Sequence, residues 1–234
     1  GLLVWILNMV RKTVLRSEFA KNVLTLLTGT ALAQAIPFAI SPILTRLFSP
    51  DDFGVFFIFS SVVAIGATIV TAKYELSVLL PERDEDAINI VALSLIITII
   101  VSSLALITII LLKEEVQELL NDKTEGFWLY LVPLSLFFVG LFQSFSYWHT
   151  RKKKFKTMSV SKVSQASTTG ISNLAVGFAN GNGLGLVSST IIGQIVAVFI
   201  LINRFLKDDG KLCVYVNPDN IRSQANRYRA FPGI

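Results

Sequence analysis

The chain has few of the residues from which disulfides, metal sites and soluble surfaces are built. Its 234 residues include one cysteine, Cys213, and one histidine, His149. No intramolecular disulfide can therefore form, and no His/Cys metal cluster can be assembled, so we expect no metal and no cofactor. Only 16% of the residues are charged and 53% are hydrophobic, which leaves too little polar surface for a soluble globule. The composition predicts a membrane protein.

The apolar stretches have the length of membrane spans. As a helix, the stretch from Trp128 to Trp148 is about 30 Å long, which matches the hydrocarbon core of a bilayer. Aromatic side chains mark both of its ends, as in spans anchored at two interfaces. Six such segments predict an all-α, polytopic six-helix bundle. The predicted spans cover residues 23–44, 53–71, 87–112, 127–149, 158–179 and 186–205.

The basic residues predict the orientation of these spans. Most of the 21 lysines and arginines precede the first span, follow the second or fourth, or lie beyond residue 203. With six spans these segments share one side, so the positive-inside rule places both termini in the cytoplasm. Because the cations flank spans, the net charge of +5 does not indicate a nucleic-acid partner. We divide the chain into residues 1–22 with an amphipathic surface helix, a lobe of residues 23–206 and a cytoplasmic tail, 207–234.

The span of residues 158–179 is too polar to face lipid on all sides. Lys162, Gln165, Thr169 and Asn173 follow each other at steps of three or four and share one helix face. We therefore expect neighbouring helices to cover this span, and the bundle to have a polar interior. Other spans contribute amides to that interior. These are Gln34, Gln143 and Gln194.

Several candidate residues have two interpretations. Lys162 either extends its ammonium to the interface or contacts an anion in the interior. Arg46 either anchors the first span or binds an anionic ligand through its planar guanidinium. The basic loop of residues 151–156 is an orientation signal or holds anionic lipid headgroups. We interpret His149 as an interfacial residue and the glycines of residues 181–185 as a turn.

No carboxylate falls inside a predicted span, so we expect no buried acid in this bundle. A transporter of organic cations would need one. Cations and amides instead suit an anionic substrate that is rich in hydroxyl groups.

Two sequence stretches resemble a known family. They are PILTRLFSPDDFG at residues 42–54 and KYELSVLLP at residues 73–81, followed by Asp86-Ala87. Both resemble the polysaccharide biosynthesis family of flippases, which includes O-antigen exporters of the multidrug/oligosaccharidyl-lipid/polysaccharide superfamily. The resemblance covers about residues 21–234, is weaker beyond residue 112, and includes NRYRAFP at residues 226–232, which is similar to the linker before the family's seventh span.

The resemblance implies that the chain is one lobe of a two-lobe flippase in the bacterial cytoplasmic membrane. Such a flippase moves undecaprenyl-diphosphate-linked oligosaccharide between leaflets and makes or breaks no bond, so we expect no enzyme activity. Implied partners are membrane lipids, a second lobe, a polysaccharide polymerase and chain-length machinery. Arg46 matches the basic residue that ends the family's first span. Candidate substrate-binding residues are Arg46, Lys162, Gln34, Gln143, Gln165, Asn173 and Gln194.

Two other functions stay open. A cation-coupled multidrug exporter of the same superfamily would depend on acids outside this lobe. A membrane glycosyltransferase or polymerase normally needs reactive carboxylates or a large external loop, and the external loop of residues 113–126 is too short to hold a catalytic site.

Overall fold

The computed structural model describes residues 18–120 and 126–231, and within these ranges it contains helices and turns but no strand. The predicted all-α class is confirmed. Of the predicted N-terminal segment, 1–22, residues 1–17 lie outside the described ranges, and Glu18 already begins α2. The elements are α2 Glu18–Leu47, α3 Pro50–Ala67, α4 Tyr74–Ser77, α5 Asp84–Leu120, η1 Phe127–Tyr130, α6 Leu131–Arg151, α7 Phe155–Phe178, α8 Gly183–Asp209, η2 Gly210–Tyr215 and α9 Pro218–Arg227.

In the described part of the chain, five helical segments are long and apolar enough to cross a membrane. They correspond to five of the six predicted spans, with ends that differ by several residues. α7, which holds the polar segment, has the required length but is not among them. The five segments are Lys21–Leu47, Pro50–Ala67, Asp84–Leu112, Phe127–Arg151 and Gly183–Tyr215.

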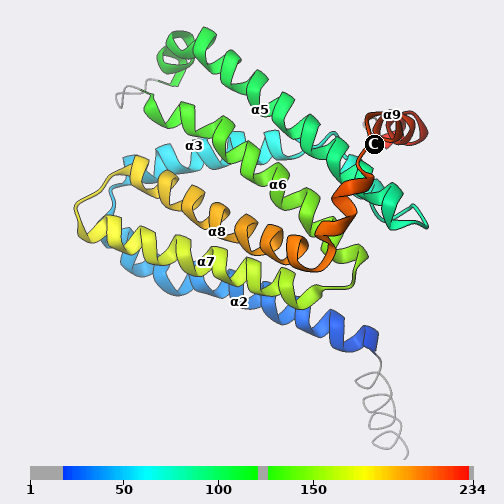
Figure 1. Ribbon diagram of the computed structural model, residues 1–234. Coiled ribbons are helices and arrows are strands. Elements are labelled where there is room, and N and C mark those ends of the chain that lie inside the picture. Colours follow the sequence, from blue (N-terminus) through cyan, green and yellow to red (C-terminus); the bar gives the residue numbers. More distant parts are fainter. Residues whose placement is uncertain (1–17, 121–125, 232–234) are drawn as a thin grey trace, which may run out of the picture.

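α7 packs between α2 and α8, and α6 packs between α8 and α5 on the other side of the molecule (Figure 1). Glycines allow the close approach of these helices. A Cβ at Gly29 of α2 would lie 2.9 Å from the Cα of Ser159, and one at Gly193 of α8 would lie 2.9 Å from the carbonyl oxygen of Gln165. Small residues at helix contacts are typical of membrane bundles.

The contacts fix the direction of each helix. Gly29 lies against Ser159, and Leu47 lies against Gly177, so α2 and α7 run parallel. Ser161 of α7 donates to the carbonyl oxygen of Ala197 at 2.9 Å. Since Gln165 lies against Gly193, α7 and α8 run antiparallel.

The turn between α2 and α3 ties three helices together. Ser49 caps α3 in a capping box, in which its hydroxyl accepts from the Asp52 amide at 3.2 Å and Asp52 accepts from the Ser49 amide at 2.9 Å. The second carboxylate oxygen of Asp52 accepts from the Gly183 amide at 2.6 Å. One acid thus joins the first turns of α3 and α8. Of the turn expected at residues 181–185, only Gly181 and Asn182 lie between the helices, because α8 already begins at Gly183.

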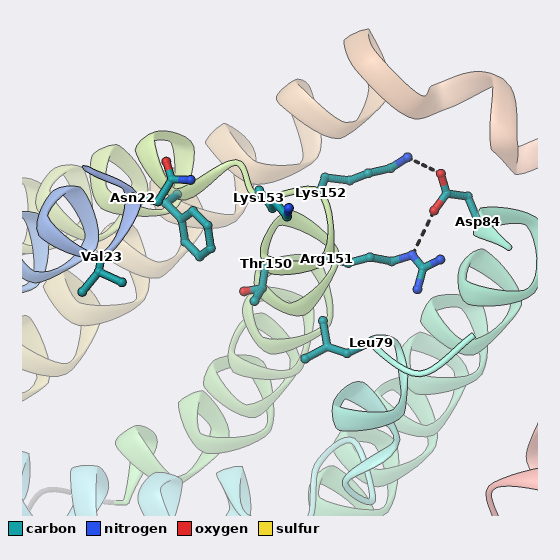
Figure 2. Close-up of a pocket in the computed structure, with 9 residues that line it drawn as sticks. Asn22, Val23, Leu79, Asp84, Thr150, Arg151, Lys152 and Lys153 are labelled. Carbon is teal, nitrogen blue, oxygen red and sulfur yellow. Dashed lines mark hydrogen bonds and ion pairs between the residues drawn. The ribbon is translucent and has the colours of Figure 1, made fainter. Parts of the chain in front are cut away.

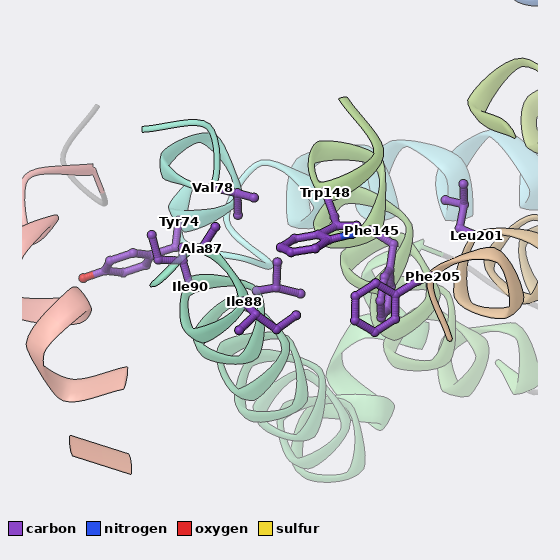
Figure 3. Packing of buried hydrophobic residues seen from close by; sticks show 10 residues of the cluster. Tyr74, Val78, Ala87, Ile88, Ile90, Phe145, Trp148, Leu201 and Phe205 are labelled. Carbon is purple, nitrogen blue, oxygen red and sulfur yellow. The ribbon is translucent and has the colours of Figure 1, made fainter. Parts of the chain in front are cut away.

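The opposite end of the bundle contains an aromatic cluster of Phe145, Trp148 and Phe205 and most of the described cations. Trp148 has no exposed surface and packs edge-on against Phe205, with ring centroids 5.6 Å apart (Figure 3). The starts of α2, α5 and α7 and the end of α6 meet here around one cavity. We call this end of the molecule the basic end.

The predicted tail is folded against the basic end. Asn89 of α5, which is fully buried, donates to the carbonyl oxygen of Tyr215 at 3.1 Å and accepts from the amide of Asn217 at 3.0 Å. The hydroxyl of Tyr74 lies 3.3 Å from the carbonyl oxygen of Ala225 in α9. These bonds hold η2 and α9 on α5 and α4.

Candidate functional site

A cavity of about 940 Å³ opens at the basic end (Figure 2). It lies between the start of α2, the residues that lead from α4 into α5, and the turn from α6 to α7. Both basic and apolar side chains contribute to its wall. The lining residues are Asn22, Val23, Leu79, Asp84, Thr150, Arg151, Lys152, Lys153 and Phe155.

Asp84 organises the cations on one side of this cavity. Its carboxylate accepts from Arg151 Nε at 2.9 Å and also from Lys152 Nζ (Figure 2). Arg151 donates further to the carbonyl oxygens of Pro81, at 2.6 Å, and Val78, at 3.2 Å. Arg151 is therefore held in place by the turn before α5. The lining contains one carboxylate and three cations, so the cavity wall is positive, although Lys152 also lies 3.7 Å from Asp209.

A second ionic network joins the α6–α7 turn to the end of α8. Lys154 Nζ contacts Asp209 at 2.6 Å and Asp208 at 3.0 Å, and Trp148 Nε1 donates to Asp209 at 3.1 Å. Burial alone would lower the pKa of Lys154, but the hydrogen bonds to Asp209 and Asp208 raise that pKa above its ordinary value. Lys154 therefore stays charged at neutral pH and links the two helices.

The candidate cations lie apart. Arg46 is exposed in the last turn of α2, at the end of the molecule opposite the cavity. Lys162 lies about two turns inside α7, is half-buried, and reaches Thr30 Oγ1 of α2 at 3.4 Å. Gln34 is exposed on α2.

The other candidate amides are satisfied or buried at separate helix contacts. Gln194 of α8 accepts from Ser135 of α6 at 3.0 Å, and Gln143 of α6 donates to the carbonyl oxygen of Ala67 at 3.0 Å. Asn173 is buried in α7, and its Oδ1 has no hydrogen-bond partner among the described residues. Gln165 is half-buried beside Gly193. None of the seven candidate residues lines the 940 Å³ cavity.

His149 is fully buried within the protein, and its expected place at the membrane interface stays a prediction. Its Nδ1 lies 2.7 Å from the carbonyl oxygen of Phe145, one turn earlier in α6, which assigns the proton to Nδ1. Its Nε2 has no partner among the described residues. α6, which carries this ring, packs against α5 and α8.

The structure places a buried acid where the sequence predicted none. Glu75 of α4 is 6% exposed and accepts a hydrogen bond from Thr71 Oγ1. Thr71 also lies 3.4 Å from Gln143 Oε1. Among the described residues Glu75 makes no ion pair. The prediction of an acid-free interior is wrong, because the chain after α3 turns back into the bundle instead of leaving it.

The polar cluster of Thr71, Glu75 and Gln143 lies beside the cavity. Gln143, Tyr147 and Thr150 follow each other on one face of α6, and Thr150 lines the cavity wall. Leu79, four residues after Glu75, lines the same wall. Tyr147 therefore lies about one helical turn from the cavity, and Glu75 lies four residues along the chain from its wall.

A comparison with protein-family models decides the family. Residues 43–207 match the model described as polysaccharide biosynthesis protein. The chain belongs to this family. The resemblance inferred from residues 42–54 and 73–81 is thereby confirmed. Searches of curated proteins and of solved structures gave no match.

As a polysaccharide biosynthesis protein with several helices able to span a bilayer, the chain is a multi-pass membrane protein. Its matched region contains α7, the basic α6–α7 turn and Glu75. Sequence reasoning missed Glu75 because it counted acids only within apolar runs, and α4 has four residues. The signal that could have found it was KYELSVLLP, in which apolar residues flank the acid on both sides.

Proposed function

We propose that this chain is the transport lobe of a flippase. In this proposal it moves a lipid-linked oligosaccharide, with undecaprenyl diphosphate as the carrier, across the bacterial cytoplasmic membrane. The lobe crosses the membrane six times, with α7 as one of the crossings and both termini in the cytoplasm. It works by alternating access with a second lobe and changes no covalent bond.

The exposure pattern of α7 supports the sixth crossing. From residue 157 to residue 178, the exposed side chains are Val160, Ile171, Ala175 and Phe178, all of which are apolar. The serines, threonines and amides of α7 are buried or half-buried against α2 and α8. A helix whose most exposed side chains are all apolar is suited to lipid despite its polar composition.

The position of Lys162 is the observation that supports an anionic substrate. It lies about 10 Å from the start of α7 at the helical rise per residue, deeper than the cations of the α6–α7 turn. A charge this far inside a span costs free energy unless it serves a contact. Thr30 is its hydrogen-bond partner, and a neutral hydroxyl does not compensate the ammonium charge. The diphosphate of a lipid carrier would do so.

The test is the export of surface polysaccharide by cells that carry the complete gene product. We expect Lys162→Ala to lower export at least tenfold, Lys162→Arg to restore part of it, and Arg46→Ala to weaken it. Lys211→Ala, an exposed lysine of η2, is the control at equal membrane abundance. Unchanged export by both Lys162→Ala and Arg46→Ala would refute an anion site at these residues.

The buried Glu75 favours a second candidate, a cation-coupled exporter of the same superfamily. A carboxylate with 6% exposure and no ion pair among the described residues is suited to hold a proton or a small cation. This candidate predicts that Glu75→Gln abolishes dye efflux, while the exposed Glu82→Gln does not. If the parent shows no dye efflux and Glu75→Gln loses polysaccharide export, the result would instead favour the flippase.

A further inference from the structure

A second cavity, of about 530 Å³, lies between α7 and α8 on the outside of the bundle. Its residues come from the first turns of α7 and the last turns of α8, at the basic end. Basic and polar side chains form one part of the wall and apolar side chains form the other. The lining residues are Lys154, Lys156, Thr157, Val160, Phe199, Ile200, Asn203, Arg204 and Lys207.

The two helices change from basic to apolar at the same level. The bond from Ser161 to Ala197 sets their antiparallel register. Along α7 the wall changes from Lys156 to Val160, and along α8 it changes in the opposite chain direction, from Lys207 to Phe199. Both apolar side chains face outward, with Val160 46% and Phe199 66% exposed. Such a level change is expected where a surface passes from the headgroup layer into the acyl chains.

The charges of this groove are only partly compensated by the protein. Asp208 pairs with Lys154 at 3.0 Å and with Arg204 at 2.8 Å, and Asp209 also binds Lys154. Lys156 and Lys207 are exposed and make no ion pair within the described ranges. Two lysines from different helices are therefore free to bind one anionic group above an apolar wall.

We propose that this groove is a binding site for an anionic phospholipid. The phosphate of the lipid contacts Lys156 and Lys207, and an acyl chain lies along Val160 and Phe199. The combination favours a lipid over a soluble phosphate, because a soluble anion would leave the exposed apolar wall uncovered. Lys154, which pairs with Asp208 and Asp209, holds the end of α8 against the α6–α7 turn and so keeps the helix ends that carry Lys156 and Lys207 together. This proposal does not depend on what the protein transports.

The experiment measures binding of phosphatidylglycerol and phosphatidylcholine to the detergent-purified complete protein by native mass spectrometry. We expect selective retention of phosphatidylglycerol. Each lysine near a headgroup contributes about fivefold to affinity, so the double variant Lys156→Gln/Lys207→Gln should bind about 25-fold more weakly. Phosphatidylcholine binding should not change. Thermal unfolding without lipid checks that the variant is folded.

A matched control removes the same charge elsewhere at the basic end. The variant Lys211→Gln/Arg222→Gln alters two exposed residues outside the groove and should bind phosphatidylglycerol within about twofold of the parent. An equal loss in both double variants would overturn the proposal, since it would show non-specific attraction. So would competition by excess glycerol phosphate, since that result would identify a soluble phosphate site.

Discussion

α5 and α7 are both long enough to cross a membrane, yet they differ strongly in composition. The most apolar 18-residue stretch of α5 has a mean hydropathy of 3.0, whereas α7 is not apolar enough to be among the candidate spans. Their outward faces are nevertheless alike, because α5 exposes Ile96, Ile100 and Leu104 while α7 exposes Val160 and Ile171. The difference is in the covered faces. Hydropathy averages over the whole circumference of a helix, so it misses α7, whose covered faces are polar, although it detects α6 and α8, which are also packed on two sides.

The largest expected effect tests whether the two outward faces share one environment. A lysine near the centre of a span costs about 2.5 to 3.5 kcal/mol. We expect Ile100→Lys in α5 and Ile171→Lys in α7 to reduce membrane insertion to a similar extent, as measured by the membrane-inserted fraction. Val214→Lys, at an 85% exposed residue of η2, should have no effect. If only the α5 variant is impaired, α7 does not face lipid.

A smaller effect tests the covered face of α7. A Cβ at Gly193 would approach the carbonyl oxygen of Gln165 to 2.9 Å, so Gly193→Ala must push α7 and α8 apart. We expect a loss of about 1 to 3 kcal/mol in the free energy of unfolding in mixed micelles. Gly54→Ala in α3 meets open space and should be neutral or slightly stabilising. Equal stability of the two variants would contradict the tight α7–α8 contact.

The smallest effect compares one serine on each helix. Ser161 is fully buried in α7 and bonds across to Ala197, whereas Ser103 of α5 is exposed. Interhelical hydrogen bonds in membrane proteins contribute about 0.6 kcal/mol on average. Ser161→Ala should lower the unfolding free energy by about that amount, and Ser103→Ala should leave it unchanged within error. A larger loss for Ser103→Ala would reverse the assignment of covered and outward faces.

The contrast between α5 and α7 also shows which features of the fold could be predicted from the sequence and which could not. Apolar length alone predicts α5, and the serines and amides of α7 predict that neighbours must cover it. The identity of those neighbours depends on long-range contacts, such as Gly29 with Ser159, that no local pattern contains.

The candidate site was less predictable than the fold. Helical spacing places Lys162, Gln165 and Asn173 on α7, but tertiary packing disperses the other amides, so that Gln194 contacts α6 and Gln143 contacts the end of α3. Glu75 is buried by a turn of four residues, too short to show a helical period. The tail is held in part by Asn89, a single polar side chain whose bonds to Tyr215 and Asn217 join residues more than a hundred positions apart.

The most direct test is to determine on which side of the bilayer each end of α8 lies. Cys213 is the natural cysteine and is exposed, and Asn182→Cys in a Cys213→Ser background places a thiol in the exposed turn between α7 and α8. A membrane-impermeant maleimide is applied to sealed vesicles of known orientation. We predict that the two thiols react from opposite sides, with Cys213 on the cytoplasmic side. Reaction of Asn182→Cys from the cytoplasmic side as well would show that α8 does not cross the membrane, and would contradict the six-span account.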